Sequence, residues 1–148
     1  MIQRIQTIFL LLAAGLLGAL LGIPFLGATP EAAYAEAGIL GDRVFSIQDH
    51  IGLLILFLLS GGLALISIFL FKNRKVQMNL TIVAALIGIG GLGFATYLLY
   101  QAGAFDTGAL IFKAGIAFPV LAVIFLFLAY RFIRKDENKI QSSYSRLR

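Results

Sequence analysis

Asp49 and His50 form the adjacent pair of side chains best suited to acid–base chemistry, and they precede a long apolar run. A carboxylate beside an imidazole suits a proton relay or a pH sensor, because histidine titrates near neutral pH. The pair also fits a capped helix start with its imidazole in water, which is the role we expect. Ser60 cannot form a hydrolytic dyad with His50, because ten helical residues separate them by about 15 Å.

Metal and cofactor chemistry would find few ligands in this chain. Cysteine is absent, which excludes disulfides and thiolate metal sites, and His50 is the only histidine. Haem would need an axial His or Met, but Met78 falls at the opposite end of the apolar runs from His50. We therefore predict no catalytic residue, no metal and no other cofactor.

Residues 88–93 read GIGGLG, which matches the dinucleotide-binding pattern G-x-G-x-x-G letter for letter. That pattern binds a pyrophosphate only where it follows a strand and opens a helix. Here no strand is predicted before it, and it lies inside an uncharged run over residues 76–105. We expect these glycines to face hydrocarbon and neighbouring helices instead of a nucleotide.

The elements that must position these residues are four long apolar segments. Hydrophobic residues make up 60% of the chain and mean hydropathy is +0.96, which is far outside the range of soluble domains. A helix needs about 20 apolar residues to cross a bilayer, and the segments lack the period-two alternation of a barrel. We predict an all-α fold, an antiparallel up-down-up-down bundle of four transmembrane helices. The single integral membrane domain has predicted spans at about 5–27, 49–71, 78–101 and 108–133, and a basic tail over 134–148.

Lys and Arg are distributed unevenly between the connections. Ten of the twelve lie before the first span, between the second and third, or after the fourth, and only Arg43 and Lys113 lie elsewhere. The positive-inside rule then places both termini in the cytoplasm. The net charge of +5 needs no nucleic acid as a partner, and we expect none.

The first span has a second interpretation, a cleaved signal peptide, because Arg4 precedes it and the small residues AYA follow at 33–35. The AYA site lies about ten residues beyond the apolar core, so we expect a retained helix. In the loop that follows, Thr29 and Pro30 predict the start of a short extracytoplasmic surface helix. Residues 46–49, SIQD, predict a capping box ahead of the second span.

Small residues four apart let helices approach closely within lipid. The candidates are Ala14, Gly18 and Gly22 in the first span and Gly88, Gly91 and Ala95 in the third. We expect these faces to pack the four helices together, and the alternative is a seam with a second copy or another membrane protein. Pro119 removes a backbone donor within the fourth span and predicts a kink.

Charged residues from both ends of the chain share the predicted cytoplasmic face. They are Arg4, Arg134, Lys135, Asp136, Glu137, Arg146 and Arg148. An interfacial ion pair of Arg4 with Asp136 or Glu137 is one expectation, because the interface is drier than water. Contact of each basic group with lipid phosphate is the other.

The two ends also carry a family resemblance. The opening MIQRIQT and the closing RKDENKI…S…RLR, joined by four spans, resemble the bacterial membrane proteins known as domain of unknown function 4293. The family often has an acidic residue before RLR, whereas this chain has Ser145, so no ion pair is assigned there. The resemblance implies a four-helix protein of the bacterial cytoplasmic (inner) membrane, with no established activity and a shared role at the cytoplasmic face.

Ionisable residues at mid-membrane usually mark ion or proton pathways, and the spans hold none. Lys113 comes nearest, but its ammonium can reach the outer surface. We therefore expect a non-enzymatic accessory or assembly subunit that acts through its cytoplasmic face. Its expected partners are the lipid bilayer and another membrane protein or a second copy. The alternatives are a transporter or channel component, sensitive to changes at Lys113 or His50, and a membrane enzyme with a convergent polar cluster.

Overall fold

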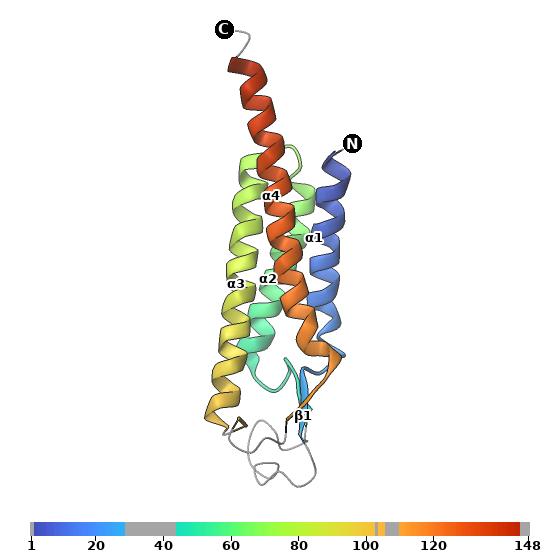
Figure 1. Ribbon diagram of the computed structural model, residues 1–148, viewed down its shortest axis with the longest axis vertical. Helices are drawn as coiled ribbons and strands as arrows, with labels where there is room; N and C mark the ends of the chain where they lie inside the picture. The colour runs from blue at the N-terminus through green and yellow to red at the C-terminus, as the bar shows by residue number, and fades with distance from the viewer. Residues whose placement is uncertain (1, 29–43, 103, 106–109, 146–148) are drawn as a thin grey trace.

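Four apolar helices form an elongated bundle in the computed structural model, which describes residues 2–28, 44–102, 104–105 and 110–145 (Figure 1). The helices are α1 (Ile2–Ala19), α2 (Ile51–Phe69), α3 (Arg74–Gln101) and α4 (Ala117–Ser145). Both α1 and α3 pack against α2 and α4, so the four helices enclose one core. The predicted all-α bundle of four helices is confirmed.

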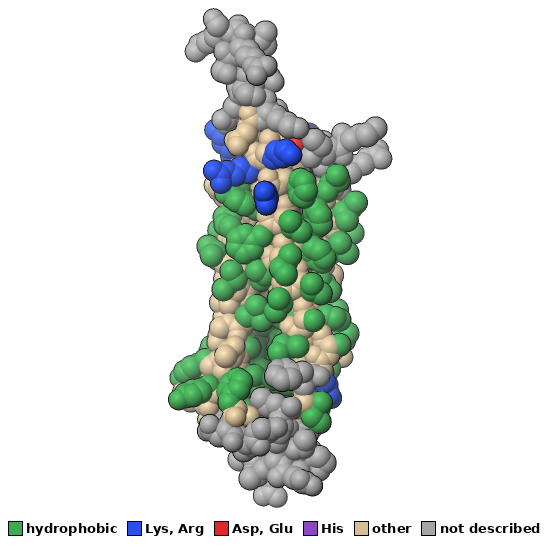
Figure 2. Space-filling model, viewed as in Figure 1, with side chains coloured by type: hydrophobic (Ala, Val, Ile, Leu, Met, Phe, Trp, Pro, Cys, Tyr) green, Lys and Arg blue, Asp and Glu red, His purple; other side chains and the backbone are tan. Residues whose placement is uncertain are grey.

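The outer surface of the bundle is apolar along most of its length (Figure 2). Large side chains such as Leu11, Ile55 and Leu86 are exposed on it, whereas the interior is rich in fully buried alanine. Three helices are long and apolar enough to cross a membrane, over Ile51–Phe69, Arg74–Gln101 and Ala114–Asn138. The apolar part of α1, Ile5–Ala19, is shorter. Such a surface indicates a multi-pass membrane protein, because water-soluble proteins rarely expose apolar patches of this extent.

The first helix ends earlier than predicted. It stops at Ala19, whereas the span was predicted to continue to about residue 27. Turns with helical hydrogen bonds follow as far as Ile23, whose N–H donates to the Ala19 carbonyl, and Pro24 prevents further continuation, because the residue before a proline is disfavoured in helical conformation. The chain turns before Pro24 and then enters strand β1 (Leu26–Ala28).

A three-stranded sheet closes one end of the bundle, the end at which α1 finishes. The sequence analysis did not predict this sheet. Strand β1 lies between β2 (Val44–Phe45) and β3 (Leu110–Phe112) and is antiparallel to both. The fourth span was predicted to begin near residue 108, but β3 and the 3-10 helix η2 (Ala114–Ile116) come before α4. Hydropathy alone cannot separate a short buried strand from the start of an apolar helix. We call this part of the molecule the sheet end.

Pro119 is the third residue of α4, so the prediction of a kink in mid-span is wrong. The first residues of a helix have no intrahelical acceptor for their N–H groups, so a proline there removes no hydrogen bond. At the other end, α4 continues as a helix to Ser145 and extends beyond α1 and the α2–α3 turn (Figure 1). The predicted tail is therefore helical over its described part, and residues 146–148 lie outside the described residues.

The small residues predicted to pack helices divide into two groups. Gly88, Gly91 and Ala95 of α3 are buried, and a Cβ added at Gly91 would lie 2.9 Å from the ring of Phe57 on α2. On α1, Ala14 is buried, but Gly18 and, in the turn after α1, Gly22 are exposed, with no described atom of another element within 4 Å of an added Cβ. These two glycines do not pack against the described helices. The predicted surface helix at Thr29 and Pro30 lies outside the described residues.

Candidate functional site at the charged end

The candidate relay residues Asp49 and His50 are both engaged in local hydrogen bonds. His50 is the N-cap of α2, and its Nδ1 accepts the amide N–H of Gly52 at 3.0 Å. Asp49 accepts the Ser46 amide N–H at 2.6 Å and the Ser46 hydroxyl at 3.1 Å. Asp49 thus reaches back as the capping box predicts, but the Ser46 oxygen accepts from Gln48, at 3.3 Å. His50, not Ser46, caps the helix.

Lys113 lies outside the helices, between β3 and η2, and its side chain is exposed. Its amide donates to the carbonyl of Phe25 at 3.1 Å, which extends the pairing of the sheet. Lys113 therefore lies at a strand end instead of in a helical turn, and its placement near a membrane surface stays a prediction.

Hydroxyl groups within the bundle are satisfied by backbone carbonyls. The Ser60 hydroxyl donates from α2 to the Ala84 carbonyl of α3 at 2.8 Å, and those of Ser67, Thr81 and Thr96 each donate to a carbonyl of their own helix. GIGGLG lies inside α3, without a strand before it. No cluster of three or more His, Cys, Asp or Glu side chains occurs in the part of the chain that the structure describes.

Polar side chains converge at the opposite end, where the first turns of α1 meet α4 and the α2–α3 turn. We call this the charged end. Gln6 Nε2 donates to Asp136 Oδ2 at 2.6 Å, and both side chains are buried, with exposed fractions of 5% and 7%. Hydrogen bonds to a charged group are strong, and a buried carboxylate needs one. The bond therefore ties α4 to α1 at the level where α4 leaves the bundle.

Asp136, one of the two acids predicted to pair with Arg4, accepts the bond from Gln6, and the ion pair of Arg4 with Asp136 or Glu137 stays a prediction. The side chain of Arg4 lies outside the described residues, as do Arg146 and Arg148, and Glu137 is half-buried. Arg134 and Lys135 are exposed on α4, and Figure 2 shows Lys and Arg gathered beside the apolar surface. Asp136 is thus buried, whereas Arg134 and Lys135, which directly precede it in sequence, are exposed.

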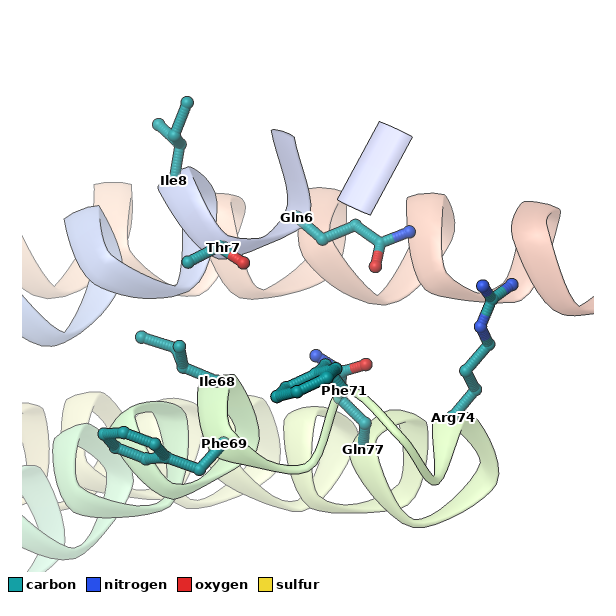
Figure 3. A pocket seen from close by; sticks show the side chains of 8 residues that line it. All are labelled: Gln6, Thr7, Ile8, Ile68, Phe69, Phe71, Arg74 and Gln77. Carbon is teal, nitrogen blue, oxygen red and sulfur yellow. The ribbon is translucent and has the colours of Figure 1, made fainter. Parts of the chain in front are cut away.

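A cavity of about 550 Å³ lies between α1 and the α2–α3 turn at this end. It is lined by Gln6, Thr7, Ile8, Ile68, Phe69, Phe71, Arg74 and Gln77 (Figure 3). In Figure 3 the side chains of Arg74 and Gln77 extend from the α2–α3 segment toward α1, where Gln6 lies. Beside the cavity, a shallow depression is lined by Lys72, Asn73, Arg74, Lys75 and Glu137. Polar and apolar groups therefore share one cavity.

Gln77 was missed by the sequence analysis, and Gln6 was not among its predicted interaction residues, because these were chosen by charge. Both are uncharged, yet each is a long polar side chain that the fold buries. A signal was present, since Gln6 precedes the first apolar run and Gln77 follows the basic turn of the second hairpin. Both amides lie at the predicted membrane depth of the charged residues, so they could have been predicted as hydrogen-bond partners of those residues.

The apolar surface, the spanning helices and the polar groups gathered at one end define the class, a helical integral membrane protein. The chain belongs to the family described as domain of unknown function (DUF4293), whose model matches residues 2–147. The resemblance seen in the two ends of the sequence is confirmed. No curated protein and no solved structure matches the chain.

Proposed function

We propose that this protein is a non-enzymatic accessory or assembly subunit of the bacterial cytoplasmic membrane. In this proposal the four helices cross the bilayer up-down-up-down, with both termini in the cytoplasm and the charged end on that side. The positive-inside rule supports the direction, because the two basic connections and the basic helix end all belong to the charged end.

One observation carries the proposal: the buried hydroxyl groups of the described bundle bond to its own backbone carbonyls, while charge is exposed on a projecting helix. Ser60 bonds Ala84 across the core, so its hydroxyl is not offered to a solute. In contrast, α4 extends past the α2–α3 turn and carries exposed Arg134 and Lys135 (Figure 1). From Asp136 to Ser145 the helix adds about 15 Å of length, enough to contact another protein.

The Gln6–Asp136 bond gives this projection a fixed base. A helix that only tethered a flexible segment would need no buried polar contact where it leaves the bundle. Here the amide of α1 holds the carboxylate of α4 at 2.6 Å in a buried position. The bond therefore orients the bases of α4 relative to the rest of the molecule, as a docking role requires.

The test is co-purification in mild detergent at native expression, read by quantitative mass spectrometry. The wild-type chain should retain a defined protein in near-stoichiometric amount, and the double charge reversal Arg134→Glu with Lys135→Glu should lose it. Lys113→Glu at the sheet end is the matched control and should retain it. A wild-type preparation without such a protein, or equal retention by the double reversal, would refute the proposal.

A further inference from the structure

The cavity at the charged end contains a buried amide without a partner. The side chain of Gln77 is only 3% exposed, and no described group forms a hydrogen bond with its amide. Its backbone is satisfied, because its N–H donates to Asn73 and its carbonyl accepts the Thr81 hydroxyl. Buried side-chain amides are nearly always paired, so an orphan that lines a cavity indicates a ligand that supplies the missing atoms.

Arg74 provides a positive charge at the same cavity. It is the first residue of α3, it is half-buried, and no ion pair or hydrogen bond of its guanidinium occurs among the described residues. A guanidinium presents five N–H donors in a planar fork that matches the oxygens of a phosphate. In Figure 3, Arg74 and Gln77 both extend from α3 into the gap between the helices. Together they offer N–H donors and a positive charge to one anionic group.

Besides Gln6 and Thr7, the rest of the lining is apolar, and part of it lies on the outer surface of the bundle. Ile8 is 54% exposed and Phe69 is 78% exposed, on the surface that we assign to the lipid chains. A soluble anion would gain nothing from these side chains, whereas an amphiphile would place its headgroup at the donors and its chains along them. The nearby acids, Asp136 bound to Gln6 and Glu137 in the adjacent depression, oppose an anion. Arg74 is therefore the charge on which binding depends.

We propose that this cavity binds the phosphate of an anionic phospholipid, with its acyl chains along Ile8 and Phe69. Arg74 and the Gln77 amide donate to the phosphate oxygens, and the exposed Lys72 and Lys75 raise the local positive potential. The inference rests on the membrane embedding of the proposed function but not on its partner. A bound lipid would fill the gap between α1 and the α2–α3 turn.

Native mass spectrometry of the detergent-solubilised full chain tests this, with phosphatidylglycerol and phosphatidylcholine titrated separately. The first phosphatidylglycerol should bind about tenfold more tightly than phosphatidylcholine, and Arg74→Gln should remove that preference. The matched control Lys75→Gln removes the same charge one position away, where the side chain is exposed, and should change the affinity by less than about twofold. Gln77→Leu should weaken the binding of both lipids, because each phosphodiester loses a donor, and it serves as the second variant if Arg74→Gln does not fold; unchanged phosphatidylglycerol affinity in Gln77→Leu would contradict the inference.

Three other results would overturn the inference. The first is equal affinity of the wild-type chain for the two lipids. The second is an equal loss in Arg74→Gln and Lys75→Gln, which would indicate only a diffuse surface charge. The third is displacement of the lipid by millimolar glycerol 3-phosphate, which has the headgroup chemistry without acyl chains and would indicate a soluble anion site. Partner retention by Arg74→Gln is measured separately, so loss of lipid preference and failure of the accessory role can be distinguished.

Discussion

The two ends of the bundle use polar atoms differently. At the sheet end, the α1–α2 and α3–α4 connections are joined by backbone pairing of β1 with β2 and β3, and the side chain of Gln48 donates to the Leu21 carbonyl. At the charged end, the buried Gln6 amide bonds the Asp136 carboxylate, and the side chains of Gln77 and Arg74 have no partner among the described residues. The sheet end is closed by backbone pairing within the chain, whereas the charged end leaves polar side chains available to a ligand.

The largest expected difference between the ends is their side of the membrane. Native cysteine is absent, so single-cysteine variants report one position each. In intact cells a membrane-impermeant maleimide should label Lys113→Cys, whereas Lys135→Cys should be labelled only after permeabilisation. Both residues are exposed, so access to the side chain itself does not limit labelling. The reverse pattern would invert the proposed topology and remove the cytoplasmic role.

The next largest effect is expected at Gly115, where the sheet end is tightest. A Cβ added at Gly115 would lie 2.2 Å from the carbonyl oxygen of Pro24, which is backbone and cannot rotate away. Gly115→Ala should therefore lower the free energy of unfolding by about 3 kcal/mol, measured by denaturation in mixed micelles. The control is Gly62→Ala on α2, which has no atom within 4 Å of its added Cβ and should be neutral or stabilising. A loss below about 1 kcal/mol at Gly115 would show that the sheet end adjusts easily.

The buried pair at the charged end should matter somewhat less. Gln6→Leu leaves the Asp136 carboxylate buried without its donor, and the free energy of unfolding should fall by about 2 kcal/mol. Asp136→Leu should cost a similar amount by leaving the amide of Gln6 unpaired. The double variant should cost clearly less than the sum of the two, because the residues share one hydrogen bond. Strictly additive losses would mean that the bond contributes nothing to the attachment of α4.

The family was recognised from residues at the two ends of the chain, MIQRIQT and RKDENKI. Hydropathy and charge were sufficient to predict the number of helices and the apolar surface. Both of these depend on averages over about 20 residues, which survive errors of several residues at the ends. The sheet was not predictable in the same way, because the register of Leu26 with Phe112 is set by contacts between distant segments. Pro119 was misplaced for the same reason, since α4 begins only after β3 and η2.

The candidate site was predicted only in its location. Charge counting indicated the end of the molecule at which Asp136 and Arg134 lie, and it predicted Arg4 as a partner of Asp136 or Glu137, a pair that the described residues do not test. The fold buries Asp136 against Gln6, because that position of α4 faces α1. Gln77 carries no charge and lies within an apolar helix, so only its burial in the structure shows that its amide has no partner. Composition can indicate where polar groups gather, whereas their partners follow from helix packing.

The smallest expected effect separates the two roles of His50 at the sheet end. If the imidazole only caps α2 through Nδ1, His50→Asn should keep that hydrogen bond and leave the free energy of unfolding nearly unchanged. His50→Ala should lower it by about 1 kcal/mol, because the Gly52 amide loses its acceptor. Neither variant should alter partner retention in the co-purification assay. If His50 relays protons, His50→Asn should impair function even though it keeps the cap, because asparagine cannot titrate. A pH-dependent phenotype of His50→Asn would therefore assign the imidazole a role beyond the cap.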